Sequence, residues 1–99
     1  MQTKLLVPTD FTEVAHTAIN HAARLAETTK GEVILLNVVS DKKDVASANK
    51  EMLEEEKIAK SFFSDCPVRS IVRIGNIFDD IGQAATEIGA NIIIMGTHG

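Results

Sequence analysis

The stretch LLVPTDFT, residues 5–12, is an apolar run that stops at a proline and places a carboxylate, Asp10, directly after it. A second apolar run, IIIM at residues 92–95, ends in the same manner and is followed by GTHG at residues 96–99. We predict that these runs are neighbouring parallel strands whose carboxyl ends share one crevice. In open parallel sheets, ligands bind outside the carboxyl ends of the strands, where the strand order reverses. The remainder of the chain is expected to support that crevice.

Length and composition narrow the class of protein. The 99 residues predict one domain, and no apolar run approaches the roughly 20 residues that a membrane-spanning helix needs. The first residues lack the layout of a signal peptide, so we expect a cytoplasmic protein. A net charge of −4 disfavours binding to nucleic acid or to anionic membranes. The single cysteine, Cys66, excludes an internal disulfide.

Strands and helices are predicted to alternate along the chain. Apolar residues recur every three or four positions over residues 14–26, 45–62 and 77–88, a spacing that predicts three helices. The β-branched runs at residues 33–39 and 68–74 predict two further strands, the first central and the second at an edge. Right-handed crossovers then give an α/β fold, an open parallel sheet in the order 3-2-1-4 with helices on both faces.

Boundary residues support these helices. Thr12 and Asn76 are suited to cap the first and third helices, and Gly31 is placed to end the first. Three consecutive glutamates, residues 54–56, fall in the second helix, and we expect them to form a solvated surface rather than a metal or partner site.

Asp10 is the most informative polar residue, and its position allows two interpretations. An aspartate between a strand and a helix commonly caps or shapes the turn. At a switch point it can instead accept hydrogen bonds from a ligand. Pro8 and Thr9 are expected to shape the turn that directs it.

The closing GTHG also has two interpretations. Glycines let backbone N–H groups approach an anion, so Gly96 and Gly99 favour a turn that holds a phosphate, with Thr97 and His98 between them. The alternative is an ordinary tight turn with a surface histidine.

Other chemistry is not indicated. Neither G-x-x-x-x-G-K-[ST] nor G-x-G-x-x-G occurs. His16 and His21 are five residues apart, which does not match a metal pair at i,i+4 of a helix. No Ser/His/Asp or Cys/His set can be assigned, so the sequence does not favour an enzyme.

The chain resembles the universal stress protein family. The stretches that carry the resemblance follow the family's order and span the chain; they are residues 5–12, 33–39, 75–88 and 91–99. The resemblance implies a Rossmann-like fold of the adenine nucleotide α-hydrolase type and, within the family's nucleotide-binding branch, ATP or AMP as ligand.

The resemblance also implies roles for individual residues. Asp10 and Val38 would lie at the adenine, Val38 through its backbone, with Pro8 and Thr9 on the same wall. Gly96 and Gly99 match the first pair of the family's glycine signature, so residues 96–99 would lie at the ribose and phosphates, where a divalent metal such as Mg²⁺ would accompany the nucleotide. Since Asp10 would lie at the base, slow ATP hydrolysis is not favoured.

In the family a fourth helix and a fifth strand follow this point, and the fifth strand commonly makes the homodimer contact. Both are absent from residues 1–99, so we expect a longer product and association through the exposed fourth strand. The function expected from the resemblance is that of an adenine-nucleotide-binding stress-response protein that senses or holds the nucleotide. The alternative is a dimerising interaction module that binds no nucleotide.

Overall fold

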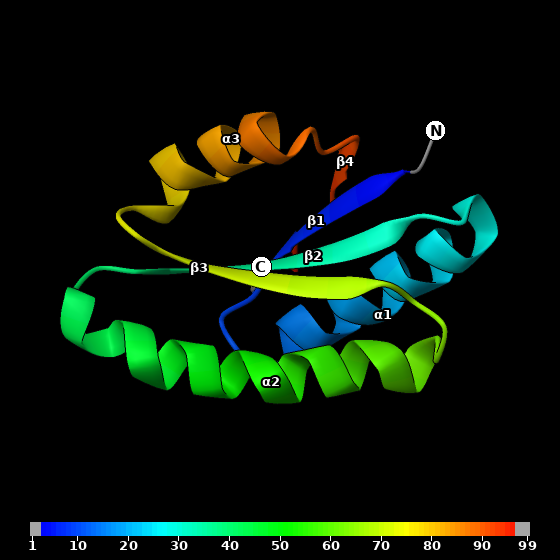
Figure 1. Cartoon of the computed structure of the whole chain (residues 1–99), viewed down its shortest axis with the longest axis horizontal. Helices are drawn as coiled ribbons and strands as arrows, with labels where there is room; N and C mark the ends of the chain where they lie inside the picture. Colours follow the sequence, from blue (N-terminus) through cyan, green and yellow to red (C-terminus); the bar gives the residue numbers. More distant parts are fainter. Residues whose placement is uncertain (1–2, 97–99) are drawn as a thin grey trace.

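Four parallel strands with helices on both faces make up the computed structural model, which describes residues 3–96 (Figure 1). In chain order the elements are β1 (Lys4–Pro8), α1 (Glu13–Thr29), β2 (Glu32–Val39), the short 3₁₀ helix η1 (Lys42–Asp44), α2 (Val45–Phe62), β3 (Val68–Ile74), α3 (Ile77–Ile88) and β4 (Ile92–Ile93). Among the described residues, no helix is long and apolar enough to cross a membrane.

The strand order is β3-β2-β1-β4, and every neighbouring pair is parallel, which confirms the predicted topology. Val33 of β2 pairs with Leu5 of β1 on one side and with Val68 of β3 on the other, so β2 is central as predicted. The chain leaves β1 towards β2, and it returns from β3 to β4 on the opposite side of β1. The switch point therefore lies at the carboxyl ends of β1 and β4.

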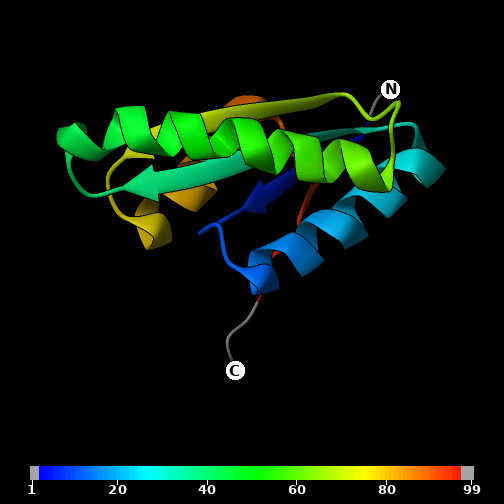
Figure 2. The ribbon, with the colours of Figure 1, turned by 90° about the horizontal axis from the view of Figure 1, so that it is seen from below.

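The two faces of the sheet are covered by different helices. Helices α1 and α2 lie on one face and α3 lies on the other (Figures 1 and 2). Because side chains alternate along a strand, Leu5 and Val7 of β1 point into the α1/α2 side and Leu6 points into the α3 side. The larger cluster of buried residues is on the α1/α2 side, and it consists of Leu5, Val7, Ala18, Ile19, Ala22, Ala26, Val33, Leu35, Met52, Ala59 and Cys66.

The prediction that Gly31 ends α1 implies a left-handed φ at this glycine, and the structure differs. The left-handed residue is Lys30, with φ +57°, and its N–H donates to the carbonyl of Ala26. Gly31 is buried, and a Cβ at this position would overlap the carbonyl oxygen of Thr3. Gly31 is thus needed for the close approach of two chain segments rather than for a left-handed turn.

The fourth strand is shorter than the predicted residues 91–95. Its ladder with β1 is limited to Leu5–Ile92 and Leu6–Ile93, although the N–H of Ile94 still donates to the carbonyl of Leu6 at 2.9 Å. A strand that is paired on one side only has fewer hydrogen bonds to keep it regular.

Candidate functional site

The turn between β1 and α1 is held firmly against β2. The N–H of Thr9 donates to the carbonyl of Leu36 at 2.8 Å, and the side-chain amide of Asn37 donates to the carbonyl of Thr9 at 2.7 Å. Phe11 adopts φ +69°, a left-handed conformation that is costly for a residue with a Cβ. Its N–H donates to the hydroxyl of Thr9 at 3.0 Å, and its ring packs against the larger core cluster.

Asp10 lies at the exposed tip of this turn. Its Oδ1 accepts hydrogen bonds from the N–H of Thr12, at 3.1 Å, and from the Thr12 hydroxyl. Thr12 in turn caps α1, because its side chain accepts from the N–H of Ala15, as predicted. Asp10 therefore shapes the turn, which is the first of its two predicted roles. Its exposure leaves room for the second role, contact with a ligand.

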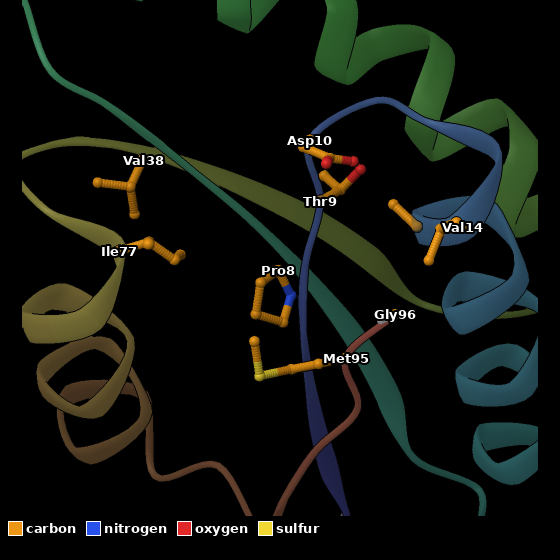
Figure 3. Close-up of a pocket in the computed structure, with 9 residues that line it drawn as sticks. Pro8, Thr9, Asp10, Val14, Val38, Ile77, Met95 and Gly96 are labelled. Carbon is orange, nitrogen blue, oxygen red and sulfur yellow. The ribbon is translucent and has the colours of Figure 1, made fainter. Parts of the chain in front are cut away.

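A cavity of about 390 Å³ opens at the carboxyl ends of the strands (Figure 3). Of the predicted site residues, it brings together Pro8, Thr9, Asp10, Val38 and Gly96. The remaining predicted residues, Thr97, His98 and Gly99, lie outside the described part of the chain. Four lining residues were not predicted, namely Val14, Ala15, Ile77 and Met95.

These additional lining residues come from positions that the sequence could have indicated. Val14 and Ala15 are in the first turn of α1 and Ile77 begins α3, so each follows directly after a strand-to-helix turn. Met95 follows β4. In a parallel sheet all such positions gather at the same edge. The apolar character of Val14, Ala15 and Ile77 had been assigned to helix packing alone, and that of Met95 to the fourth strand.

Gly96 has a packing role in addition to the one predicted for it. A Cβ at Gly96 would lie 2.6 Å from both Cγ1 and the carbonyl oxygen of Val14. Only glycine lets the segment after β4 pass this close to the first turn of α1. The segment after β4 and the turn after β1 are thereby brought to the same cavity.

Behind the turn lies a polar network that was not predicted. Glu55 of α2 is only 3% exposed, so the expectation of a fully solvated surface at residues 54–56 is wrong for this residue. Its Oε1 accepts from the hydroxyl of Thr9 at 2.6 Å, and its Oε2 lies 2.8 Å from Nε2 of His16. The spacing along the helix could have indicated that Glu55 is buried, because it lies three residues after Met52 and four before Ala59, on the buried face of α2.

The second strand-to-helix turn at the cavity, between β3 and α3, is built differently. Asn76 caps α3 as predicted, its Oδ1 accepting from the N–H of Phe78 at 2.8 Å. Asp80 accepts from the N–H of Asn76 and from Nε of Arg73. Nη1 of the same arginine donates to Glu87 at 2.7 Å. The hydrogen bond with Glu87 is the main cause that raises the pKa of Arg73.

Residues 3–96 contain no group of three or more His, Cys, Asp or Glu side chains arranged to hold a metal ion.

The parallel sheet with a cavity at its switch point defines an α/β protein of the kind that binds small ligands at the carboxyl ends of its strands. The model of the universal stress protein family matches residues 1–99. The chain therefore belongs to this family, which confirms the resemblance.

Individual relatives agree with this assignment. Universal stress protein MJ0577 of Methanocaldococcus jannaschii is 31% identical over 127 aligned positions, which cover all of this chain and 78% of that protein. The solved structure of MJ0577 superposes with a TM-score of 0.73 at 32% identity, covering 100% of this chain and 77% of that one.

Two more distant structures show the same fold. A universal stress protein from Archaeoglobus fulgidus has a TM-score of 0.84 at 16% identity, covering 99% of this chain and 77% of that chain. A universal stress protein in complex with cAMP has a TM-score of 0.79 at 16% identity, covering 92% of this chain and 69% of that chain.

Proposed function

We propose that the cavity at the strand ends binds an adenine nucleotide, ATP or AMP, and that the protein senses or holds the nucleotide rather than hydrolysing it. The observation that carries the proposal is the gathering of Pro8, Thr9, Asp10, Val38 and Gly96 around one cavity at the switch point. These residues come from three separate stretches of sequence. Each had been assigned to the nucleotide from the family resemblance.

The chemistry of the lining suits the base of a nucleotide. Pro8, Val38, Ile77 and Met95 offer apolar surface for a flat, poorly hydrated ring, as Figure 3 shows. Asp10 adds a carboxylate that can accept hydrogen bonds from an amine or a hydroxyl. A volume of about 390 Å³ is within the usual range of about 300–1,000 Å³ for small-molecule sites.

The phosphates would extend towards residues 96–99, and a divalent metal such as Mg²⁺ would bind there with them. Support for the adenine class comes from the solved universal stress protein that holds cAMP, an adenine nucleotide.

Calorimetric titration with ATP, AMP, adenosine and GTP tests this function. We expect the three adenine compounds to bind and GTP to bind weakly or not at all. Asp10→Asn should weaken adenosine binding by roughly tenfold, because a charged hydrogen-bond acceptor is replaced by a neutral one. Glu27→Gln removes a charge from an exposed position on α1 and is the matched control. Equal affinity for GTP, or no binding of any adenine compound at millimolar concentration, would contradict the proposal.

A second proposal concerns self-association through β4. Ile92, Ile93 and Met95 are 38%, 43% and 54% exposed, which leaves apolar side chains beside the unpaired edge of this strand. We expect a homodimer in sedimentation velocity experiments, and Ile93→Lys should shift it to monomer. A monomer at all concentrations would contradict the dimer, and an unchanged dimer in Ile93→Lys would exclude β4 as its interface.

A further inference from the structure

We propose that Glu55 is a positioning residue for the proposed nucleotide site and that, with His16, it sets the affinity for the adenine end through the turn of residues 9–12. This inference rests on the proposed function. Glu55 does not line the cavity, so it would act through Thr9 and the turn that carries Asp10.

The directions of the hydrogen bonds form one continuous chain. The N–H of Phe11 donates to Oγ1 of Thr9, so the hydroxyl hydrogen of Thr9 is directed to Oε1 of Glu55. Nε2 of His16 lies 2.8 Å from Oε2, so a hydrogen on Nε2 would be donated to this carboxylate oxygen. Both oxygens of Glu55 are thus used, and they connect α2 and α1 to the turn.

Packing alone does not account for a carboxylate at this position. Glu55 shares the buried face of α2 with Met52 and Ala59, which are apolar. Replacing a buried ion pair by apolar groups of similar volume is often neutral or stabilising, so stability gives little reason for a glutamate here. What the glutamate supplies instead is a directional tether to a residue 46 positions away.

The tether acts where the backbone is strained. Phe11 has a left-handed φ, and its N–H depends on the Thr9 hydroxyl that Glu55 orients. Without the carboxylate, the Thr9 hydroxyl is free to rotate, and the turn loses a contact that favours the strained conformation. Asp10 lies between Thr9 and Phe11, so its placement depends on the same contact. Rigid placement of a binding group raises affinity because less conformational entropy is lost when the ligand binds.

The test compares three variants by their affinity for adenosine, measured by calorimetry. Glu55→Met fills the same space without hydrogen bonds and should weaken binding by roughly tenfold. Glu55→Gln keeps an acceptor for Thr9 and a donor for a neutral His16, so it should restore most of the affinity. Glu54→Gln, on the exposed side of α2, is the control and should bind as the wild type does.

A double variant separates positioning from general stability. In an Asp10→Ala background, Glu55→Met should have little further effect on adenosine affinity, because the side chain that it positions is absent. Wild-type affinity in Glu55→Met, or a loss of the same size with and without Asp10, would overturn the proposal. If Glu55→Met does not fold, His16→Leu carries the same test with an expected loss of roughly threefold.

A measurement without ligand distinguishes failure of this inference from failure of the proposed function. If the wild type binds no adenine compound, the proposed function fails. Amide hydrogen exchange still measures how firmly the turn of residues 9–12 is held. Exchange at Phe11 and Thr12 should be faster in Glu55→Met and unchanged in Glu54→Gln. Unchanged exchange in Glu55→Met would overturn the positioning role.

Discussion

Two strand-to-helix turns contribute to the same cavity, and they are stabilised in opposite ways. The turn after β1 is tied to a buried carboxylate on a helix 46 residues away, by the hydrogen bond from Thr9 to Glu55. The turn after β3 is also bonded to β2, through the N–H of Gly75 and the carbonyl of Val39 at 2.8 Å, but its side-chain contacts come from Arg73, Asp80 and Glu87 near the surface. The comparison teaches that a buried side chain from a distant helix supports the wall carrying Asp10, whereas partly exposed ion pairs support the wall carrying Ile77.

The largest expected effect is at the turn after β1, which is bonded to the buried Glu55. Thr9→Val keeps the shape of the side chain but leaves Oε1 of Glu55 and the N–H of Phe11 without their partner. The free energy of unfolding should fall by about 1–3 kcal/mol, as for other unsatisfied buried polar groups. Urea denaturation followed by circular dichroism measures the change. If Thr9→Val lowered the free energy of unfolding no more than Arg73→Met does, the two turns would not differ in this way.

A smaller effect is expected at Gly75 in the second turn. A Cβ there would overlap the carboxylate of Asp80 and displace it from Arg73 and from the N–H of Asn76. Gly75→Ala should lower the free energy of unfolding by about 1 kcal/mol, the usual value of a hydrogen bond. In an Asp80→Ala background the same substitution should cost less, and the cost that remains is that of the φ of +158° at Gly75. An equal cost in both backgrounds would show that Asp80 is not the cause.

The Arg73 ion pairs should contribute less than either of these. The Arg73 side chain is 23% exposed and that of Glu87 is 64% exposed, so water and salt weaken their attraction. Arg73→Met should shift the urea midpoint less than Thr9→Val does, and high salt should reduce the shift further. Arg73→Lys should lie between the wild type and Arg73→Met, because lysine keeps the charge without the forked geometry. A shift that does not respond to salt would indicate packing rather than charge.

The smallest expected effect concerns Cys66, which belongs to the core cluster on the side of α1 and α2. Burial raises the pKa of its thiol. The unfolded chain therefore loses the thiol proton at a lower pH than the folded one. Relative to Cys66→Ala, the wild type should lose a small amount of stability as pH rises above the usual thiol pKa, and none below it. Identical pH profiles from urea denaturation would contradict this.

The sequence predicted the fold well because its signals were periodic and local. Apolar spacing identified the three helices, and the alternation of strands and helices led to the order β3-β2-β1-β4. The caps at Thr12 and Asn76 were also predicted, since each cap contacts residues two or three positions away. For the candidate site, residues at the ends of strands were predicted because parallel strands deliver their carboxyl ends to one edge.

Other features were not predictable from local pattern. The left-handed residue at the end of α1 is Lys30 rather than Gly31, and Gly31 is instead required where the chain passes the carbonyl of Thr3. The spacing of Glu55 to Met52 and Ala59 could have indicated that it is buried, but its partners Thr9 and His16 are far away in the sequence and could not be identified from it.

By itself, the sequence determined the elements, their order and the family, because these follow from spacing along the chain. Only the tertiary structure decided which polar residues are buried together, since Thr9, His16 and Glu55 come from three different segments. It also decided that Gly96 must lack a side chain beside Val14. The physical reason is the same in both cases. Burial and close approach depend on distances between segments, which are set only when the helices pack against the sheet.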